Sequence, residues 1–120
     1  MTSMDFSRAW LGVLLFAAAC GGALSEGKSE FKKGRYAEAK ETFLRTEGES
    51  RTWDDGRRAQ YSLYRGLTHS ALGDRGAATL WLREAKAVED AHPGTMSAED
   101  VTRLTLGLEA LGPEAAAPER

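Results

Sequence analysis

The chain has 120 residues, with 16 Lys and Arg against 18 Asp and Glu, so its formal net charge at pH 7 is −2. This length is enough for one small domain, and the balanced charge, without a basic stripe that alternates with aromatic residues, argues against nucleic acid as a partner. Ala and Leu are abundant and β-branched residues are few, which favours helices over strands.

The first segment is an apolar run over residues 9–19 that follows Arg8 and ends at Cys20, the single cysteine. The run is shorter than the roughly 20 residues that span a membrane, and it fits the apolar region of a secretory signal, about 7–15 residues long. With small residues before Cys20 and Gly21 after it, the layout resembles a bacterial lipoprotein signal peptide. The resemblance implies that residues 1–19 are removed and that Cys20 carries a covalent lipid. It also implies that Gly21 directs the protein to the outer membrane, facing the periplasm.

The alternative for Cys20 is a free thiol at the end of an ordinary signal peptide or of a buried N-terminal helix. A single cysteine allows no intrachain disulfide. Apart from the lipid on Cys20, no cofactor is expected.

Helix periodicity and helix-end signals predict five helices, over about residues 23–33, 36–47, 53–72, 74–90 and 97–111. Gly34, Gly48 and Gly73 are expected to end the first three, because glycine adopts the left-handed conformation of a helix exit. The polar stretch 48–51 is predicted to be a connector, with Thr52 as the cap of the next helix. Ser97 is the expected cap of the last helix, in a variant of the capping box. Residues 113–120 are expected to be disordered.

Two stretches of the chain share one spacing of glycines. Gly66 and Gly73 repeat the spacing of Gly27 and Gly34, and a helix with small and large apolar positions follows each pair. This pattern resembles the tetratricopeptide repeat (TPR), a helix–turn–helix unit of about 34 residues. The resemblance implies an all-α TPR-like domain over residues 20–112, with repeats over about 21–48 and 53–91 and a capping helix over 97–111. It assigns close helix packing to Gly27, Gly34, Ala39, Phe43, Gly66, Gly73, Ala78, Leu82 and Ala85.

The alternative for these stretches is a general pair of helical hairpins. Relative to the family's repeat length, about five residues are inserted between the repeats, near residues 48–53. Two repeats bury little by themselves, and repeat arrays usually need about three units. The last helix is therefore expected either to cap the array or to pair with a second copy of the chain.

The family's partner surface lies on the first helix of each repeat. The candidate partner-binding residues are Lys28, Phe31, Lys32, Leu63, Leu67 and Ser70, with Trp53 at the connector. The other interpretations are solvated lysines, leucines that belong to the core, and a Trp53 that packs against the start of its own helix. Trp81 falls on the apolar stripe of its helix, where core packing is the expected role.

Chemistry of a catalytic or metal site is not evident in the sequence. Only two histidines occur, His69 and His92, and neither has the ligand spacing of a metal site. The chain is therefore not expected to be an enzyme. We expect a lipid-anchored adaptor that binds envelope proteins or their peptide segments. The alternative is a structural envelope lipoprotein that associates only with itself.

Overall fold

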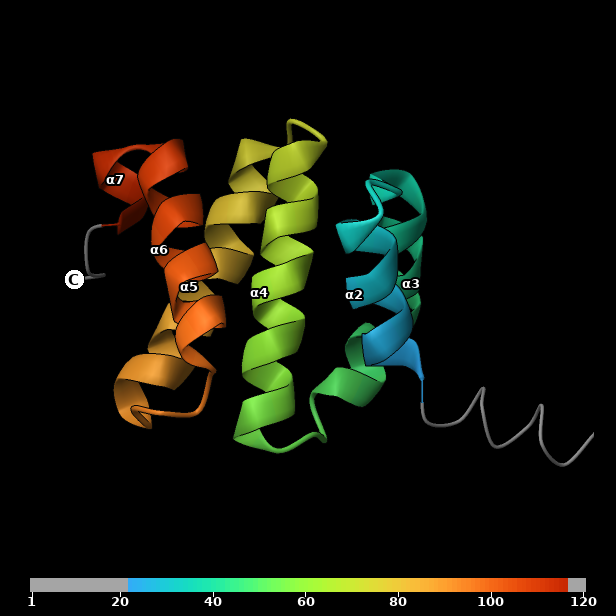
Figure 1. Ribbon diagram of the computed structural model, residues 1–120, viewed down its shortest axis with the longest axis horizontal. Coiled ribbons are helices and arrows are strands. Elements are labelled where there is room, and N and C mark those ends of the chain that lie inside the picture. The colour runs from blue at the N-terminus through green and yellow to red at the C-terminus, as the bar shows by residue number, and fades with distance from the viewer. Residues whose placement is uncertain (1–21, 117–120) are drawn as a thin grey trace, which may run out of the picture.

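The computed structural model describes residues 22–116, and this part of the chain is entirely helices and short turns (Figure 1). The helices are α2 (Ala23–Lys32), α3 (Tyr36–Ser50), α4 (Asp55–Ala71), α5 (Arg75–Ala91), α6 (Ala98–Leu111) and α7 (Pro113–Ala116). The prediction of an all-α domain is confirmed for these residues. The predicted signal peptide over residues 1–19, Cys20 and residues 117–120 lie outside the described residues. Between residues 22 and 116, no helix combines the length and the apolar character that crossing a membrane requires.

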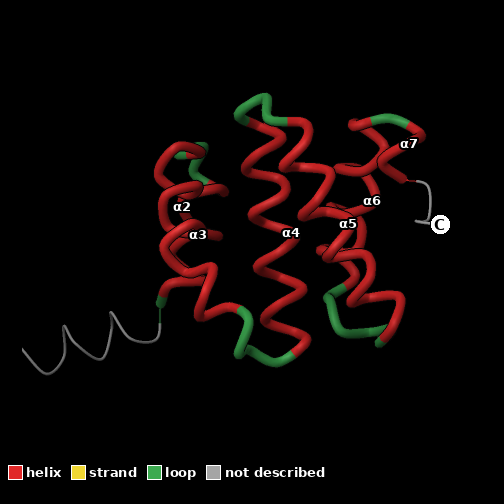
Figure 2. Tube along the Cα trace, turned by 180° about the vertical axis from the view of Figure 1, so that it is seen from behind, coloured by secondary structure: helices red, strands yellow, loops and turns green. Residues whose placement is uncertain are grey.

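Consecutive helices pack as hairpins, α2 against α3 and α4 against α5. The central helix α4 also contacts α2, α3 and α6. Helices α2, α4 and α6 lie side by side in Figure 1, and α3 and α5 lie behind them, as the view from the other side in Figure 2 shows. Because α4 has neighbours on every side, all its residues from 61 to 66 are buried.

The two hairpins have the same internal packing. A Cβ atom on Gly27 of α2 would lie 2.5 Å from Cε1 of Phe43 on α3, and a Cβ on Gly66 of α4 would lie 2.7 Å from Cδ2 of Leu82 on α5. These distances are shorter than van der Waals contact, so each pair of helices approaches as closely as it does because the first helix carries a glycine there. The small residues Ala39, Ala78 and Ala85 have no exposed surface.

The turns within the hairpins are also equivalent. Gly34 and Gly73 have φ angles of 78° and 83°, in the left-handed region that glycine adopts without strain. Of the residues to which the TPR resemblance assigned helix packing, two glycines thus lie at turns, two glycine–apolar pairs lie in the contact between paired helices, and the three alanines are buried.

The end of α3 differs from the prediction. Gly48 does not end the helix, which continues to Ser50, so the predicted polar connector is the last turn of α3. Glycine disfavours a helix interior by only about 1 kcal/mol, and the side chains of this turn are engaged in the fold. Asp54, rather than Thr52, caps α4 and accepts a hydrogen bond of 2.9 Å from the amide of Arg57.

The last two helices extend the packing beyond the hairpins. Ser97 caps α6 as predicted, accepting a hydrogen bond of 3.2 Å from the amide of Asp100. Residues 113–116 form the short helix α7, so the prediction of disorder is wrong for them. Ala115 is buried there, and Arg83 of α5 donates a hydrogen bond of 3.1 Å to its carbonyl.

Candidate functional site

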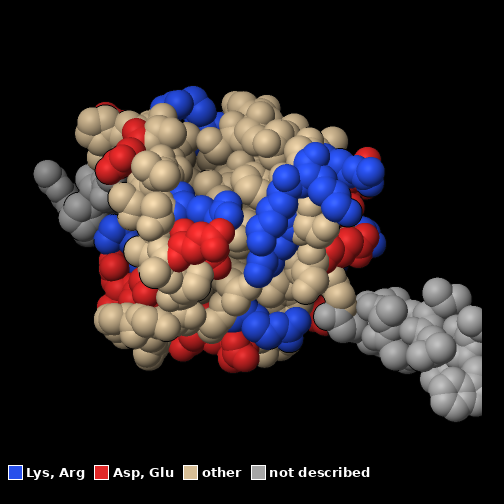
Figure 3. Space-filling model, in the orientation of Figure 1, with Lys and Arg blue, Asp and Glu red and all other residues tan. Residues whose placement is uncertain are grey.

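The surface over α2, α4 and α6, which we call the α2–α4–α6 face, carries a group of lysines above one tyrosine. Lys28 donates a hydrogen bond of 2.7 Å from Nζ to Oε1 of Gln60 on α4, and its Nζ lies 5.3 Å from the ring centroid of Tyr64. Nζ of Lys32, one turn along α2, lies 5.8 Å from the same centroid. Both distances allow a cation–π interaction. Figure 3 shows a band of Lys and Arg side chains on this face, where α2 lies next to α4.

Tyr64 is a fixed platform for these two ammonium groups. Only 2% of its surface is exposed, and its hydroxyl donates a hydrogen bond of 2.8 Å to Oδ1 of Asp100 on α6. Burial and this hydrogen bond raise the pKa of Tyr64 to about 12, so the phenol stays protonated. The ring of Phe31 meets it edge to face, with centroids 5.7 Å apart. Side chains from α2, α4 and α6 therefore hold this platform together.

Charge on the face is divided between its two edges. At the α6 edge, Arg103 forms an ion pair with Glu99. The hydrogen bond from Arg103 is the main reason why the pKa of Glu99 lies below its usual value, and the charge of Lys32 lowers this pKa to a lesser degree. At the α2 edge, neither Lys28 nor Lys32 forms an ion pair with a carboxylate among residues 22–116. The face is therefore neutralised along α6 and positive along α2.

The structure divides the predicted partner-binding residues into accessible and inaccessible ones. Lys32 is exposed, Lys28 is half-buried, and both lie on the face. Leu63 has no exposed surface, because α4 is covered on all sides at that point, so its prediction as a partner-binding residue is wrong. Leu67 is half-buried and packs on α6, where its Cδ2 lies 2.9 Å from the position of a Cβ on Gly107.

Three predicted residues have mixed surroundings. Phe31 is half-buried between the rings of Tyr64 and Tyr36. Ser70 is half-buried near the end of α4. Trp53 is half-buried before α4, with its ring edge to face with that of Tyr61 at 5.8 Å and the guanidinium of Arg57 at 4.3 Å from its centroid. The surroundings of Trp53 match the interpretation in which it packs against the start of its helix.

Sequence reasoning missed a buried polar cluster around Arg65 of α4. Nη1 of Arg65 lies 2.5 Å from Oε1 of Glu47 on α3 and donates a hydrogen bond of 3.0 Å to the hydroxyl of Tyr61. Its guanidinium also lies 4.1 Å from the ring centroid of Trp81 on α5. Nε of Arg65 donates a hydrogen bond of 3.3 Å to Nε2 of His69. The cluster therefore joins α3, α4 and α5 from the inside.

The buried imidazole of His69 makes the stability depend on pH. Burial, followed by the charge of Arg65, lowers the pKa of His69 below its usual value. The unfolded chain takes up this proton near pH 6.5 and the folded chain only at lower pH, so the unfolding free energy must fall as the pH drops below about 6.5. In a His69→Gln variant, we expect the unfolding free energy measured with urea to fall less between pH 7.5 and 5.5 than it does in the unmodified chain.

The matched control is His92→Gln, which removes an exposed imidazole. It is expected to leave in place the part of the pH dependence that arises at His69. Identical pH dependence in the unmodified chain and the His69→Gln variant would contradict a neutral, buried His69.

Residues 22–116 contain no group of three or more His, Cys, Asp or Glu side chains placed to hold a metal ion. Comparisons with models of known families, with curated proteins and with solved structures yield no match to this chain.

Proposed function

We propose that this protein is a lipid-anchored adaptor, built from TPR-like hairpins, that holds a partner protein on the α2–α4–α6 face. Two observations support the TPR-like assignment. Both hairpins have the same contact between a glycine of the first helix and a large apolar side chain of the second, and the first helix of each hairpin lies beside that of the next. In such an array the first helices form one continuous surface, as partner binding by repeat proteins requires.

The observation that carries the proposed function is the pair of lysines above Tyr64. Lys28 and Lys32 are oriented by a rigid ring and, for Lys28, by Gln60, yet neither forms an ion pair with a carboxylate of the described residues. A partner segment with acidic side chains would complete these contacts through charge-assisted hydrogen bonds, which are stronger than neutral ones. The proposed partner is therefore an envelope protein that presents an acidic segment.

The lipid at Cys20 is the second part of the proposal. It would keep the adaptor at the periplasmic side of the outer membrane and raise its local concentration near membrane partners. Loss of fatty-acid labelling and of membrane partition in a Cys20→Ala variant is the expected result. Undiminished labelling would contradict the lipid anchor and would leave the proposal for the α2–α4–α6 face unchanged.

Charge reversal on the face tests the adaptor role. The double variant Lys28→Glu/Lys32→Glu is expected to reduce recovery of the partner from solubilised membranes at least tenfold, because two attractive contacts become repulsive. The matched control is Arg35→Glu/Arg45→Glu, which makes the same charge change at exposed positions outside the face. Far-UV circular dichroism and the thermal midpoint verify that both variants fold.

Equal recovery by both double variants would contradict the assignment of the face. Light scattering on the purified chain measures its oligomeric state and so distinguishes the adaptor from a structural lipoprotein that associates only with itself. A chain that forms stable oligomers and recovers only copies of itself would favour a self-associating lipoprotein.

A further inference from the structure

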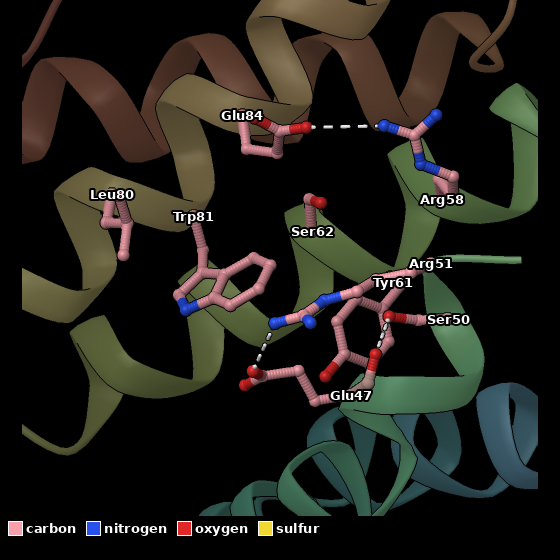
Figure 4. A pocket seen from close by; sticks show the side chains of 9 residues that line it. All are labelled: Glu47, Ser50, Arg51, Arg58, Tyr61, Ser62, Leu80, Trp81 and Glu84. Atoms are coloured by element: carbon pink, nitrogen blue, oxygen red, sulfur yellow. Dashed lines mark hydrogen bonds and ion pairs between the residues drawn. The ribbon is translucent and has the colours of Figure 1, made fainter.

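A hollow of about 220 Å³ opens between the end of α3, the first half of α4 and the middle of α5 (Figure 4). It is distinct from the lysine group over Tyr64, and no residue of that group lines it. The walls are largely apolar, with Tyr61 and Trp81 inside and Leu80 exposed at the mouth. An engineered apolar cavity of about 150 Å³ binds benzene, so the hollow has room for one substituted aromatic ring.

The aromatic wall of the hollow is held in place by its neighbours. The ring of Trp81 meets that of Tyr61 edge to face, with centroids 5.7 Å apart. The guanidinium of Arg65 also lies 4.1 Å from the ring centroid of Trp81. Trp81 was expected in the core, and it does pack against the core, but it is only half-buried and lines this hollow as well. An incoming ring would meet a surface that needs little ordering.

One hydroxyl group in the hollow is available to a ligand. Ser62 of α4 lines the hollow and is 3% exposed, and its hydroxyl forms no hydrogen bond within residues 22–116. Figure 4 shows this hydroxyl among the lining side chains, between Trp81 and Arg58. Other buried hydroxyls of α4 are satisfied, as in Thr68, which donates a hydrogen bond of 2.7 Å to the carbonyl of Tyr64. Because the hydroxyl of Ser62 lines the hollow and has no hydrogen bond to the described residues, it can bond to the polar end of a ligand.

The charges around the hollow cancel. Arg58 of α4 lies 3.5 Å from Oε1 of Glu84 on α5, and Arg51 lies 3.2 Å from Oε2 of Glu47 on α3. Each rim charge thus has its opposite beside it. The rim favours a neutral occupant over an ion of either sign.

We propose that this hollow binds the side chain of a tyrosine from a partner protein, with its ring against Trp81 and its hydroxyl bonded to Ser62. The aromatic walls favour a ring, the hydroxyl of Ser62 favours a polar group at one end of that ring, and the neutral rim favours a ligand without charge. Typical small-molecule sites enclose about 300 Å³ or more, and the smaller hollow fits one side chain of a bound segment. This inference does not depend on the partner surface proposed above.

The test compares two ligands that differ by one hydroxyl group. N-acetyl-L-tyrosinamide and N-acetyl-L-phenylalaninamide are titrated into the full ¹⁵N-labelled chain, and the indole signal of Trp81 is followed by NMR, with that of Trp53 as the internal reference. The tyrosine amide is expected to shift the Trp81 signal and to bind about 3–10-fold more tightly than the phenylalanine amide, the value of one neutral hydrogen bond. This comparison needs no variant.

Two serine variants locate the hydrogen bond. Ser62→Ala is expected to abolish the preference for the tyrosine amide, whereas the matched control Ser70→Ala on the same helix keeps it. Equal affinities of the two amides for the unmodified chain would overturn the role of Ser62, and an unmoved Trp81 signal would overturn the site. Binding of free 4-methylphenol without binding of the tyrosine amide would overturn the partner side chain and identify a small phenol in its place.

Discussion

Replacing Gly66 with alanine is expected to lower the free energy of unfolding by about 3 kcal/mol, at the upper end of what overpacking costs. The new Cβ would lie 2.7 Å from two side-chain atoms of Leu82 and 3.0 Å from its backbone nitrogen. The Leu82 side chain is completely buried, and a backbone atom cannot rotate away. Helices α4 and α5 would have to separate, and the gain in helix propensity of about 1 kcal/mol would not offset that. Urea unfolding followed by circular dichroism measures the change.

The chain contains a matched control for this substitution. Gly48 lies inside α3, and a Cβ there would meet no atom within 4 Å. Gly48→Ala is therefore expected to raise the unfolding free energy by up to about 1 kcal/mol. The same substitution in two helices should change stability in opposite directions.

A double variant checks that the cost of Gly66→Ala arises at Leu82. In a Leu82→Ala background the two side-chain atoms at 2.7 Å would be gone and the backbone nitrogen at 3.0 Å would remain, so the two changes should be less destabilising together than the sum of the single effects. Strict additivity, or equal effects of alanine at positions 66 and 48, would contradict close packing between α4 and α5.

Glu47→Gln is expected to lower the unfolding free energy by about 2–3 kcal/mol, because it leaves the guanidinium of Arg65 buried without its counter-charge. The side chain of Arg65 is only 8% exposed, whereas that of Glu47 is 35% exposed. The partial exposure of Glu47 keeps the cost below that of a fully buried pair. The hydrogen bond to Arg65 also holds the pKa of Glu47 below its usual value, so the stabilisation is lost as the pH falls through that range.

Glu49→Gln is the control for this prediction, since Glu49 is an exposed residue of the same helix turn, and its effect is expected to stay within about 0.5 kcal/mol. Adding Arg65→Met to Glu47→Gln should restore part of the lost stability, because the stranded charge is removed. A double variant as unstable as the summed single effects would argue against a coupled pair.

Helix ends are predictable from the sequence where the signals are local. Gly34 and Gly73 mark turns because few other residues accept a positive φ, and Ser97 marks a helix start because its hydroxyl satisfies a free amide. The prediction at Gly48 was wrong because the same residue type tolerates a helix interior when its turn is used in packing. Asp100 fits the capping box in spacing, yet its carboxylate accepts a hydrogen bond from Tyr64, which only the folded chain brings near.

Of the candidate sites, the sequence could place Lys28 and Lys32 one helix turn apart but could not place them above Tyr64. The cluster around Arg65 was invisible for the same reason, since Glu47 and Arg65 lie on different helices. Leu63 was misassigned because α4 is covered on every side, a property of the assembled hairpins. The sequence could not indicate a role for the hydroxyl of Ser62, because only the folded chain brings it into one hollow with Trp81.

Site-specific photo-cross-linking in native membranes tests most directly whether the α2–α4–α6 face binds the partner. A photoreactive phenylalanine replaces either Ser25, an exposed residue of α2 beside Lys28 and Lys32, or Leu44, an exposed residue of α3 outside the face. The proposed function predicts a cross-link from position 25 to one other envelope protein and none to that protein from position 44. A cross-link to a partner from position 44 alone, or cross-links only between copies of this chain, would contradict it.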